Sequence, residues 1–249
     1  MDQIQQLQRM IDESSRIVFF GGAGVSTESS IPDFRSTDGL YHQTYQYPPE
    51  VIVSHTFFVQ KTEEFYDFYK KKMIFPDAQP NPAHLKLAEL EKAGKLTAVV
   101  TQNIDGLHQK AGSQKVFELH GSVHRNYCQK CHKFFDVNYV AGAEGVPRCD
   151  ECGGLVKPDV VLYEEGLDAS VMRGAVDAIS EADMLIIGGT SLVVYPAAGM
   201  IDYFHGKHLV LINKDATSRD RQAELCITDP IGEVLGQIRV NPRKREILC

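Results

Sequence analysis

The 249-residue sequence contains no apolar run of about 20 residues, the length that a membrane-spanning helix needs. Its N-terminus also lacks the basic stretch and apolar run of a secretory signal, so we expect a cytoplasmic protein. Positive charge is not in excess: 26 Lys and Arg stand against 33 Asp and Glu, for a formal net charge of −7. No overall basic field attracts phosphates, and neither a membrane nor nucleic acid is an expected partner.

Cysteine is scarce, with six residues, but four of them form two C-x2-C pairs. The pairs are Cys128 with Cys131 and Cys149 with Cys152. In a chain without a secretion signal, this spacing favours metal ligation over disulfides, although four unrelated cysteines remain the alternative. Four thiolates complete a tetrahedral zinc site and leave no position for water, which predicts a structural role. The nearby His124 and His132 stay open as alternative ligands.

Short apolar runs rich in β-branched residues alternate with helical patterns along most of the chain. The expected buried strands are 17–20, 96–100, 116–119, 184–187 and 209–212, with helical patterns between several of them, for example at 84–92 and 171–179. Strands that alternate with helices predict a parallel sheet covered on both faces. The expected fold class is therefore α/β, with a Rossmann-like, doubly wound parallel sheet.

Two stretches interrupt this alternation and look like insertions. Residues 36–80 are rich in aromatic residues and contain a predicted helix at 62–72, whereas residues 124–157 contain the cysteine pairs. We expect 1–35, 81–123 and 158–249 to form the large domain. The helical insertion 36–80 and the four-cysteine zinc ribbon 124–157 would together form a small domain.

A glycine-rich turn, Gly22-Ala23-Gly24-Val25-Ser26-Thr27, follows the first predicted strand. It lacks the third glycine of the dinucleotide-binding pattern, and no acidic residue stands clearly about 20 positions later. Taken alone, the turn is compatible with either a purely structural role or a phosphate-binding site. Two further strand ends carry small or polar residues: Gly189, Thr190 and Ser191 after one strand, and Asn213 after another. Three such ends at the carboxyl edge of a sheet favour a dinucleotide site.

Residues 101–108 concentrate amide, carboxylate and imidazole groups in the segment TQNIDGLH, directly after a predicted strand. With GAGVS at 22–26, IPDFR at 31–35, His120-Gly121, the two cysteine pairs and GTS at 189–191, this segment resembles the sirtuin family. The motifs follow the family's order over residues 16–235. The resemblance implies an NAD-dependent protein-lysine deacetylase of bacterial type, in which NAD and acetyl-lysine peptides or proteins meet between a Rossmann-like domain and a zinc domain.

The resemblance also implies roles for individual residues. Its NAD contacts are Gly22, Ala23, Gly24, Ser26 and Thr27 at the phosphates; Phe34 and Arg35 over the cofactor; Gln102, Asn103, Ile104 and Asp105 at the ribose and nicotinamide; Gly189, Thr190 and Ser191 at the far phosphate; and Asn213, Cys226 and Ile227 at the adenosine.

The resemblance further implies that His120 is the general base, with Asn103 as a second catalytic residue. In the family's mechanism, the amide oxygen of the acyl-lysine displaces nicotinamide, and an imidazole then activates a ribose hydroxyl. The products are lysine, nicotinamide and O-acetyl-ADP-ribose. A neutral imidazole suits this task because its ordinary pKa of about 6.5 lies near working pH.

The chain departs from the family after the second cysteine pair, where a strand ending in Phe-Gly-Glu is usual. Here the strand is expected to run through Val160 and Val161 to Tyr163, to contact the substrate and to pair with its backbone. Glu164 in place of glycine predicts that no positive φ is needed there.

A second departure concerns the acyl group. Family members selective for acidic acyl groups share a Tyr-x-x-Arg pair, which here reads Tyr66 and Tyr69. Without the guanidinium, succinyl and malonyl groups are disfavoured, which predicts a deacetylase, with longer apolar acyl chains as a further option. Ordinary aromatic packing is the alternative interpretation of these two tyrosines.

Two other functions stay open from the sequence. A mono-ADP-ribosyltransferase would cleave NAD in the same way but modify protein instead. The second is a zinc-ribbon module that binds a partner such as nucleic acid, on a nucleotide fold without catalytic activity. The net negative charge and the presence of Asn103, Asp105 and His120 argue against this function.

Overall fold

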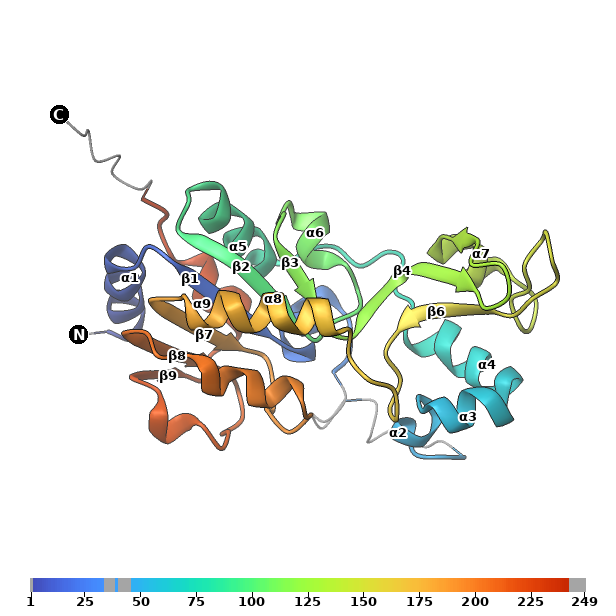
Figure 1. Ribbon diagram of the computed structural model, residues 1–249. Helices are drawn as coiled ribbons and strands as arrows, with labels where there is room; N and C mark the ends of the chain where they lie inside the picture. Colours follow the sequence, from blue (N-terminus) through green and yellow to red (C-terminus); the bar gives the residue numbers. More distant parts are fainter. Residues whose placement is uncertain (1, 34–38, 40–45, 242–249) are drawn as a thin grey trace.

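A six-stranded parallel sheet forms the centre of the computed structural model, which describes residues 2–33, 39 and 46–241 (Figure 1). Its strands are β1 (Ile17–Gly21), β2 (Leu96–Thr101), β3 (Val116–Glu118), β7 (Met184–Gly188), β8 (His208–Ile212) and β9 (Leu225–Ile227). Their order is β3-β2-β1-β7-β8-β9, and every neighbouring pair is parallel. This is the strand order of the Rossmann fold, with its reversal between β1 and β7. The predicted fold class is confirmed.

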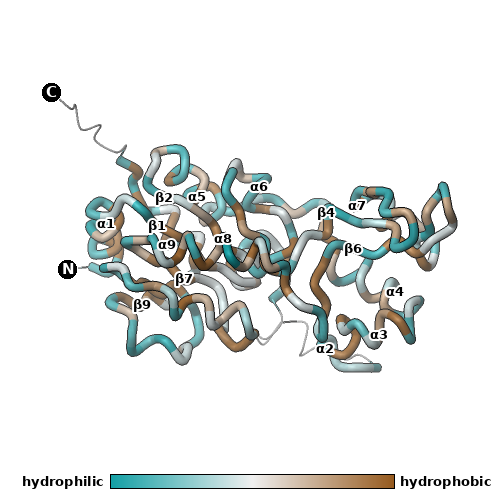
Figure 2. Tube along the Cα trace, in the orientation of Figure 1, coloured by the Kyte–Doolittle hydropathy of each residue, from teal (hydrophilic) through white to brown (hydrophobic). Residues whose placement is uncertain are grey.

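Both faces of the sheet are covered because its strands are apolar on both sides. Alternate residues of a strand point to opposite faces, so Ile17 and Phe19 pack in one core and Val18 and Phe20 in another. The first core includes residues of α1 (Gln3–Glu13), α5 (Pro82–Lys92) and α9 (Ile231–Gly236). The second includes α8 (Ala169–Ser180) and η4 (Ala197–Tyr203). Figure 2 shows hydrophobic and hydrophilic residues alternating along the covering helices.

The edge strand β3 differs from expectation. The sequence predicted a buried strand at 116–119, but all three residues of β3 are only half-buried. The reason is its position: β3 pairs with β2 alone and forms one border of the sheet. Apolar composition did not distinguish this border strand from the central ones.

The two insertions form one smaller module beside the large sheet (Figure 1). Helices α2 (Pro49–Ile52), α3 (His55–Gln60) and α4 (Thr62–Lys72) share a core with a three-stranded antiparallel sheet and α7 (Val137–Gly142). The sheet has the order β5 (Phe134–Phe135), β4 (Gly121–Cys128) and β6 (Val156–Val160). The helix predicted at 62–72 is confirmed as α4. Strands β4 and β6 run across the predicted domain boundaries at 123–124 and 157–158, so they connect the two parts.

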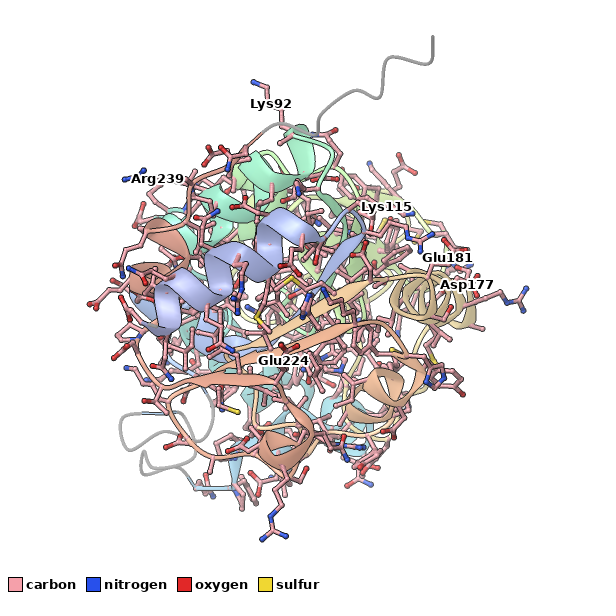
Figure 3. The ribbon with its side chains drawn as sticks, turned by 90° about the vertical axis from the view of Figure 1, so that its left-hand side faces the viewer. Lys92, Lys115, Asp177, Glu181, Glu224 and Arg239 are labelled. Atoms are coloured by element: carbon pink, nitrogen blue, oxygen red, sulfur yellow. The ribbon has the colours of Figure 1, made fainter. Side chains whose placement is uncertain are left out.

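Exposed charges of both signs mark the end of the molecule that carries the large sheet. Figure 3 labels six of these side chains: Lys92, Lys115, Asp177, Glu181, Glu224 and Arg239. Among residues 2–33, 39 and 46–241, no helix combines the length and the apolar character that crossing a membrane requires.

Candidate active site and metal centre

A cavity of about 820 Å³ opens at the carboxyl ends of β1, β2, β7 and β8, where open α/β sheets bind ligands. It brings together most of the site residues predicted from the sequence. These are Gly22, Ala23, Gly24, Ser26, Thr27, Gln102, Asn103, Ile104, Asp105, His120, Val160, Val161, Tyr163, Gly189, Thr190, Ser191 and Asn213. Phe34 and Arg35 lie outside the described residues, and their predicted contacts stay predictions.

Two glycine turns form one wall of this cavity. The N–H of Gly22 donates to the Gly188 oxygen at 3.2 Å, and that of Gly24 donates to the Gly189 oxygen at 2.8 Å. A Cβ built on Gly24 would lie 2.8 Å from the Gly189 Cα, which is too close for any side chain. Glycine is therefore required for these two turns to pack closely against each other. The resulting wall exposes backbone at the glycines. The chain continues from Gly22 into η1 (Ala23–Val25) and η2 (Thr27–Ser29).

The turn after β2 is fixed by a network of buried polar groups. Asn103 Nδ2 donates to Ser26 Oγ at 3.1 Å, and Ser26 Oγ donates to Asp105 Oδ2 at 2.7 Å. The second carboxylate oxygen of Asp105 accepts from the Leu107 N–H at 2.9 Å, at the start of α6 (Leu107–Ala111). The amide and the carboxylate that the resemblance places at nicotinamide are therefore held in one orientation. Ser26, from another strand end, is part of the same network.

Gln102 connects this turn to two other parts of the cavity. Its side-chain Nε2 donates to Thr190 Oγ1 at 3.0 Å, and its backbone oxygen lies 2.9 Å from His120 Nδ1. Because a carbonyl oxygen only accepts, Nδ1 carries the proton and Nε2 of His120 keeps its lone pair. Burial lowers the pKa of His120 below its ordinary value, and the hydrogen bond to Gln102 opposes this only in part. His120 is therefore a neutral imidazole at pH 7, with a basic nitrogen.

The predicted substrate strand is shorter than expected. Strand β6 ends at Val160, so Val161 to Tyr163 lie beyond it, although they line the cavity. The N–H of Val161 donates to the His120 oxygen at 3.0 Å, and that of Tyr163 donates to the Val53 oxygen at 3.0 Å. These two donors are used within the chain, so pairing with a substrate backbone cannot depend on them. Such pairing stays a prediction.

The prediction that Glu164 needs no positive φ is wrong, because its φ is 75°. A left-handed conformation costs a non-glycine residue about 1 kcal/mol or more. Here the side chain offsets that cost: its Oε2 accepts from the backbone N–H of Thr56 at 2.9 Å and from the hydroxyl of Thr56 at 2.7 Å. The turn after β6 is thereby attached to α3 of the small module.

Strand β9 does not place its predicted residues at the cavity. Cys226 and Ile227 lie within β9, outside the lining, and Ile227 contributes its oxygen to the N–H of Asn213 at 2.9 Å. The cavity is lined instead by Asp229, Pro230 and Ile231, which follow the strand. Sequence reasoning missed these three residues, although the rule that ligands bind beyond strand ends could have found them.

The small module contributes a second wall, which sequence reasoning found only in part. Of the two tyrosines singled out in α4, Tyr69 lines the cavity, whereas Tyr66 donates its buried hydroxyl to the Val156 oxygen. The other lining residues from this side are Val53, Lys72, Met73 and Phe75. Because Tyr69, Lys72 and Met73 are three and four positions apart, they lie on one face of the end of α4.

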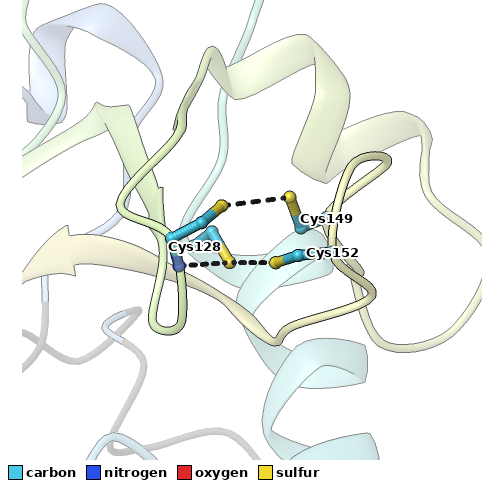
Figure 4. Close-up of side chains that lie close together, drawn as sticks. Cys128, Cys149 and Cys152 are labelled. Atoms are coloured by element: carbon cyan, nitrogen blue, oxygen red, sulfur yellow. Dashed lines mark hydrogen bonds between the residues drawn. The ribbon is translucent and has the colours of Figure 1, made fainter.

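The four paired cysteines converge at the far end of the small module (Figure 4). All four sulfurs lie within 4.8 Å of one another, with 3.4 Å between Cys128 and Cys152 and 3.6 Å between Cys131 and Cys149. Sulfurs bound at about 2.3 Å to one ion would be about 3.8 Å apart, so the cluster fits a closed zinc site. The backbone N–H of Cys131, with that of Lys130, lowers the pKa of Cys128 and favours its thiolate.

The two histidines considered as alternative ligands are not part of this cluster. His124 Nε2 lies 3.0 Å from the backbone oxygen of Asp105. The exposed His132 belongs to the first cysteine turn, where its N–H donates to the Cys128 oxygen at 2.9 Å. Within the described part of the chain, the four cysteines are therefore the residues placed to hold a metal ion.

Comparison with known proteins agrees with this geometry. The model of the Sir2 family matches residues 22–196. The chain belongs to the Sir2 family. This sirtuin is 64% identical to an NAD-dependent protein deacetylase of Clostridium acetobutylicum, over 94% of this chain and 97% of that protein. It is 52% identical to an NAD-dependent protein deacetylase of Cutibacterium acnes, again over 94% and 97%.

The fold of this sirtuin is similar to solved Sir2 complexes with substrates and with products. A Sir2 complex with a p53 peptide and NAD+ superposes with a TM-score of 0.83 at 40% identity, covering 94% of this chain and 96% of that one. A Sir2 variant with deacetylated p53 peptide and 3′-O-acetyl ADP ribose gives a TM-score of 0.86 at 40% identity, covering 93% and 95%. The family predicted from the order of motifs is confirmed.

Proposed function

We propose that this sirtuin is an NAD-dependent protein-lysine deacetylase. It converts acetyl-lysine, NAD+ and one water into lysine, nicotinamide and O-acetyl-ADP-ribose. The observation that carries the proposal is the placement of His120, whose free Nε2 shares one cavity with the two glycine turns and with the network of Ser26, Asn103 and Asp105. The names of its relatives support the same reaction.

The large sheet supplies the groups that would hold NAD. Gly22, Gly24 and Gly189 carry no side chain, so the backbone of these turns would permit close approach of phosphates. Asn103 and Asp105 would contact nicotinamide from their fixed positions. NAD supplies the ribose carbon that accepts the acetyl oxygen and releases nicotinamide.

His120 moves the proton of the second half-reaction. Its Nε2 takes a proton from a ribose hydroxyl, which makes that oxygen nucleophilic toward the acetyl carbon. The Gln102 oxygen fixes the tautomer through Nδ1 and stabilises the imidazolium that forms. Burial keeps the pKa of His120 low, so the base is neutral before it acts.

Acetylated protein lysines are the proposed substrates, entering beside Val160, Val161 and Tyr163. Acetyl groups are preferred over succinyl and malonyl groups because Tyr69 stands where a guanidinium would bind a carboxylate. The cytoplasmic location inferred from the sequence remains part of this proposal.

The test is incubation of purified protein with an acetyl-lysine peptide, with and without NAD, followed by mass spectrometry. Loss of acetyl should require NAD, match the O-acetyl-ADP-ribose formed, and be abolished in His120→Ala. The exposed His205, outside the cavity lining, gives the control variant His205→Ala, which should stay active. Nicotinamide release with ADP-ribose left on protein would favour the transferase instead. Intact NAD with every acetyl peptide would contradict the proposal.

A further inference from the structure

A second cavity, of about 630 Å³, lies beside α2 and α3 of the small module, and we call it the flanking cavity. Tyr163 and Glu164, in the turn after β6, line both this cavity and the one that contains His120. The turn is fixed to the small module by backbone: the Tyr163 N–H donates to the Val53 oxygen, and the His55 N–H donates to the Tyr163 oxygen, both at 3.0 Å. A peptide that binds beside this turn therefore reaches both cavities.

Much of the flanking cavity is apolar. The rings of Tyr47 and Phe57 meet edge-on with centroids 5.3 Å apart, and the exposed Val51 and Tyr163 add further apolar surface. The aliphatic stem of a long side chain packs on such a surface while its polar head stays in water.

Two exposed carboxylates, of Glu50 and Glu164, also line the flanking cavity. Among the described residues, Glu50 has no ion-pair partner and no hydrogen bond reaches Oε1 of Glu164, since Thr56 donates to Oε2. The one cation of the described lining is Lys61, whose Nζ already lies 3.3 Å from Glu64 Oε1 and over the Tyr47 ring. The charge left for a ligand is therefore negative.

The backbone at Glu164 indicates that its carboxylate has a role. The φ of 75° is one that glycine adopts without strain, and glycine is usual at this position in the family. Strained conformations of other residues persist where the surrounding structure holds them, often at binding sites. Hydrogen bonds from Thr56 hold the side chain here and lower the pKa of Glu164, which keeps its charge.

Resting on the proposed deacetylase function, we propose that the flanking cavity binds an arginine or lysine side chain of the substrate protein, near the acetyl-lysine in sequence. The stem of that side chain lies on Tyr47, Val51 and Phe57, and its charged head reaches Glu50 and Glu164. An extended peptide turns its side chains alternately to opposite sides, so one position of the peptide is suited to reach this cavity.

The experiment measures kcat/KM for acetyl-lysine peptides that are otherwise neutral. A single arginine is placed at each position from three before to three after the acetyl-lysine and is compared with citrulline, its uncharged isostere. At one position, arginine should exceed citrulline by roughly two- to fivefold, as exposed ion pairs do, through a lower KM. The advantage should shrink as salt is added.

Two variants assign this advantage to the flanking cavity. In Glu50→Gln and in Glu164→Gly the ratio of arginine to citrulline at that position should fall toward one. The ratio compares two peptides with one enzyme preparation, so a loss of folded protein cancels. The matched control is Glu63→Gln, which removes an exposed carboxylate from the first turn of α4, outside both cavities, and should keep the wild-type ratio.

The other outcomes oppose the proposal. An equal advantage at every position would assign it to general attraction by the net charge of −7. A ratio that survives in both variants would place the contact elsewhere. If the peptides are deacetylated but arginine never exceeds citrulline, only this inference fails. If no acetyl peptide reacts with NAD, the deacetylase function itself fails.

Discussion

Nδ1 of His120 and the backbone oxygen of Gln102 are 2.9 Å apart, and this contact decides which nitrogen of the imidazole keeps its lone pair. It also connects the end of β2 with the residue that precedes β4. The orientation of His120 is therefore set by backbone, and no side-chain carboxylate is needed to hold it.

The pH dependence of catalysis follows from the burial of His120. In the proposed mechanism the neutral form is the base, and it predominates above the pKa of His120, which burial lowers from the ordinary value of about 6.5. We expect kcat/KM for acetyl peptide to be flat from about pH 8 to 6.5 and to fall only at lower pH. A pH profile measures this, with circular dichroism to show that the fold persists. An acidic limb centred above pH 6.5 would contradict the effect of burial.

Arg125 holds together the two segments that flank His120. Its Nη1 lies 2.6 Å from Glu118 Oε2 in β3, and its Nε lies 2.7 Å from Asp159 Oδ2 in β6. Arg125→Met should lower kcat about fivefold, because a partly exposed ion pair contributes about 1 kcal/mol. Steady-state kinetics with and without added salt should show wild-type activity falling toward the variant as salt rises. The exposed Arg173 in α8 gives the control Arg173→Met; equal effects of both substitutions would exclude a specific role.

Lys95 stabilises the large domain from a buried position. It is 7% exposed, and its Nζ donates to the oxygens of Ile11, Asp12 and Ser14 at the end of α1, at 3.1, 2.7 and 2.7 Å. Lys95→Met leaves these oxygens without a donor and should lower the free energy of unfolding by about 2–3 kcal/mol. Urea unfolding measures the change. The control Lys92→Met, at the exposed site labelled in Figure 3, should change it by less than about 0.5 kcal/mol.

The cysteine cluster should contain about one zinc ion per chain. Cys149→Ser removes one ligand, so we expect loss of zinc by metal analysis and a lower melting temperature. Because the first pair begins at the end of β4 and the second pair lies just before β6, activity should fall as well. Cys226→Ser, outside the cluster, should keep both metal and stability. Full zinc content in Cys149→Ser would show that this sulfur is not a ligand.

The sequence predicted well which residues of the large sheet line the cavity, because each of these motifs directly follows a strand. Gly22 to Ser26 and Gly189 to Ser191 need only a strand end and local backbone freedom, and both properties can be read from a few neighbouring residues. The cysteine pairs are similar, since their spacing alone brings each pair of sulfurs together.

Features that depend on distant contacts could not be predicted in this way. The positive φ of Glu164 is made acceptable by Thr56, which is 108 positions earlier in the chain. Asp229, Pro230 and Ile231 beyond β9 were missed because the end of that strand depends on its register, with Ile227 opposite Ile212 of β8. The choice between Tyr66 and Tyr69 at the cavity depends on the rotation of α4 against β6, which periodicity does not determine.

The two walls of the cavity have separate structural origins, and this has an evolutionary consequence. The proposed nucleotide recognition depends on glycine turns that tolerate almost no substitution, because a Cβ on Gly24 would meet the opposite backbone. The wall at Tyr69 and Met73 is made of side chains from the inserted module, at the end of α4 and close to it in the fold. We therefore expect relatives of this enzyme to vary more in the side chains of the inserted module's wall than at the glycine turns.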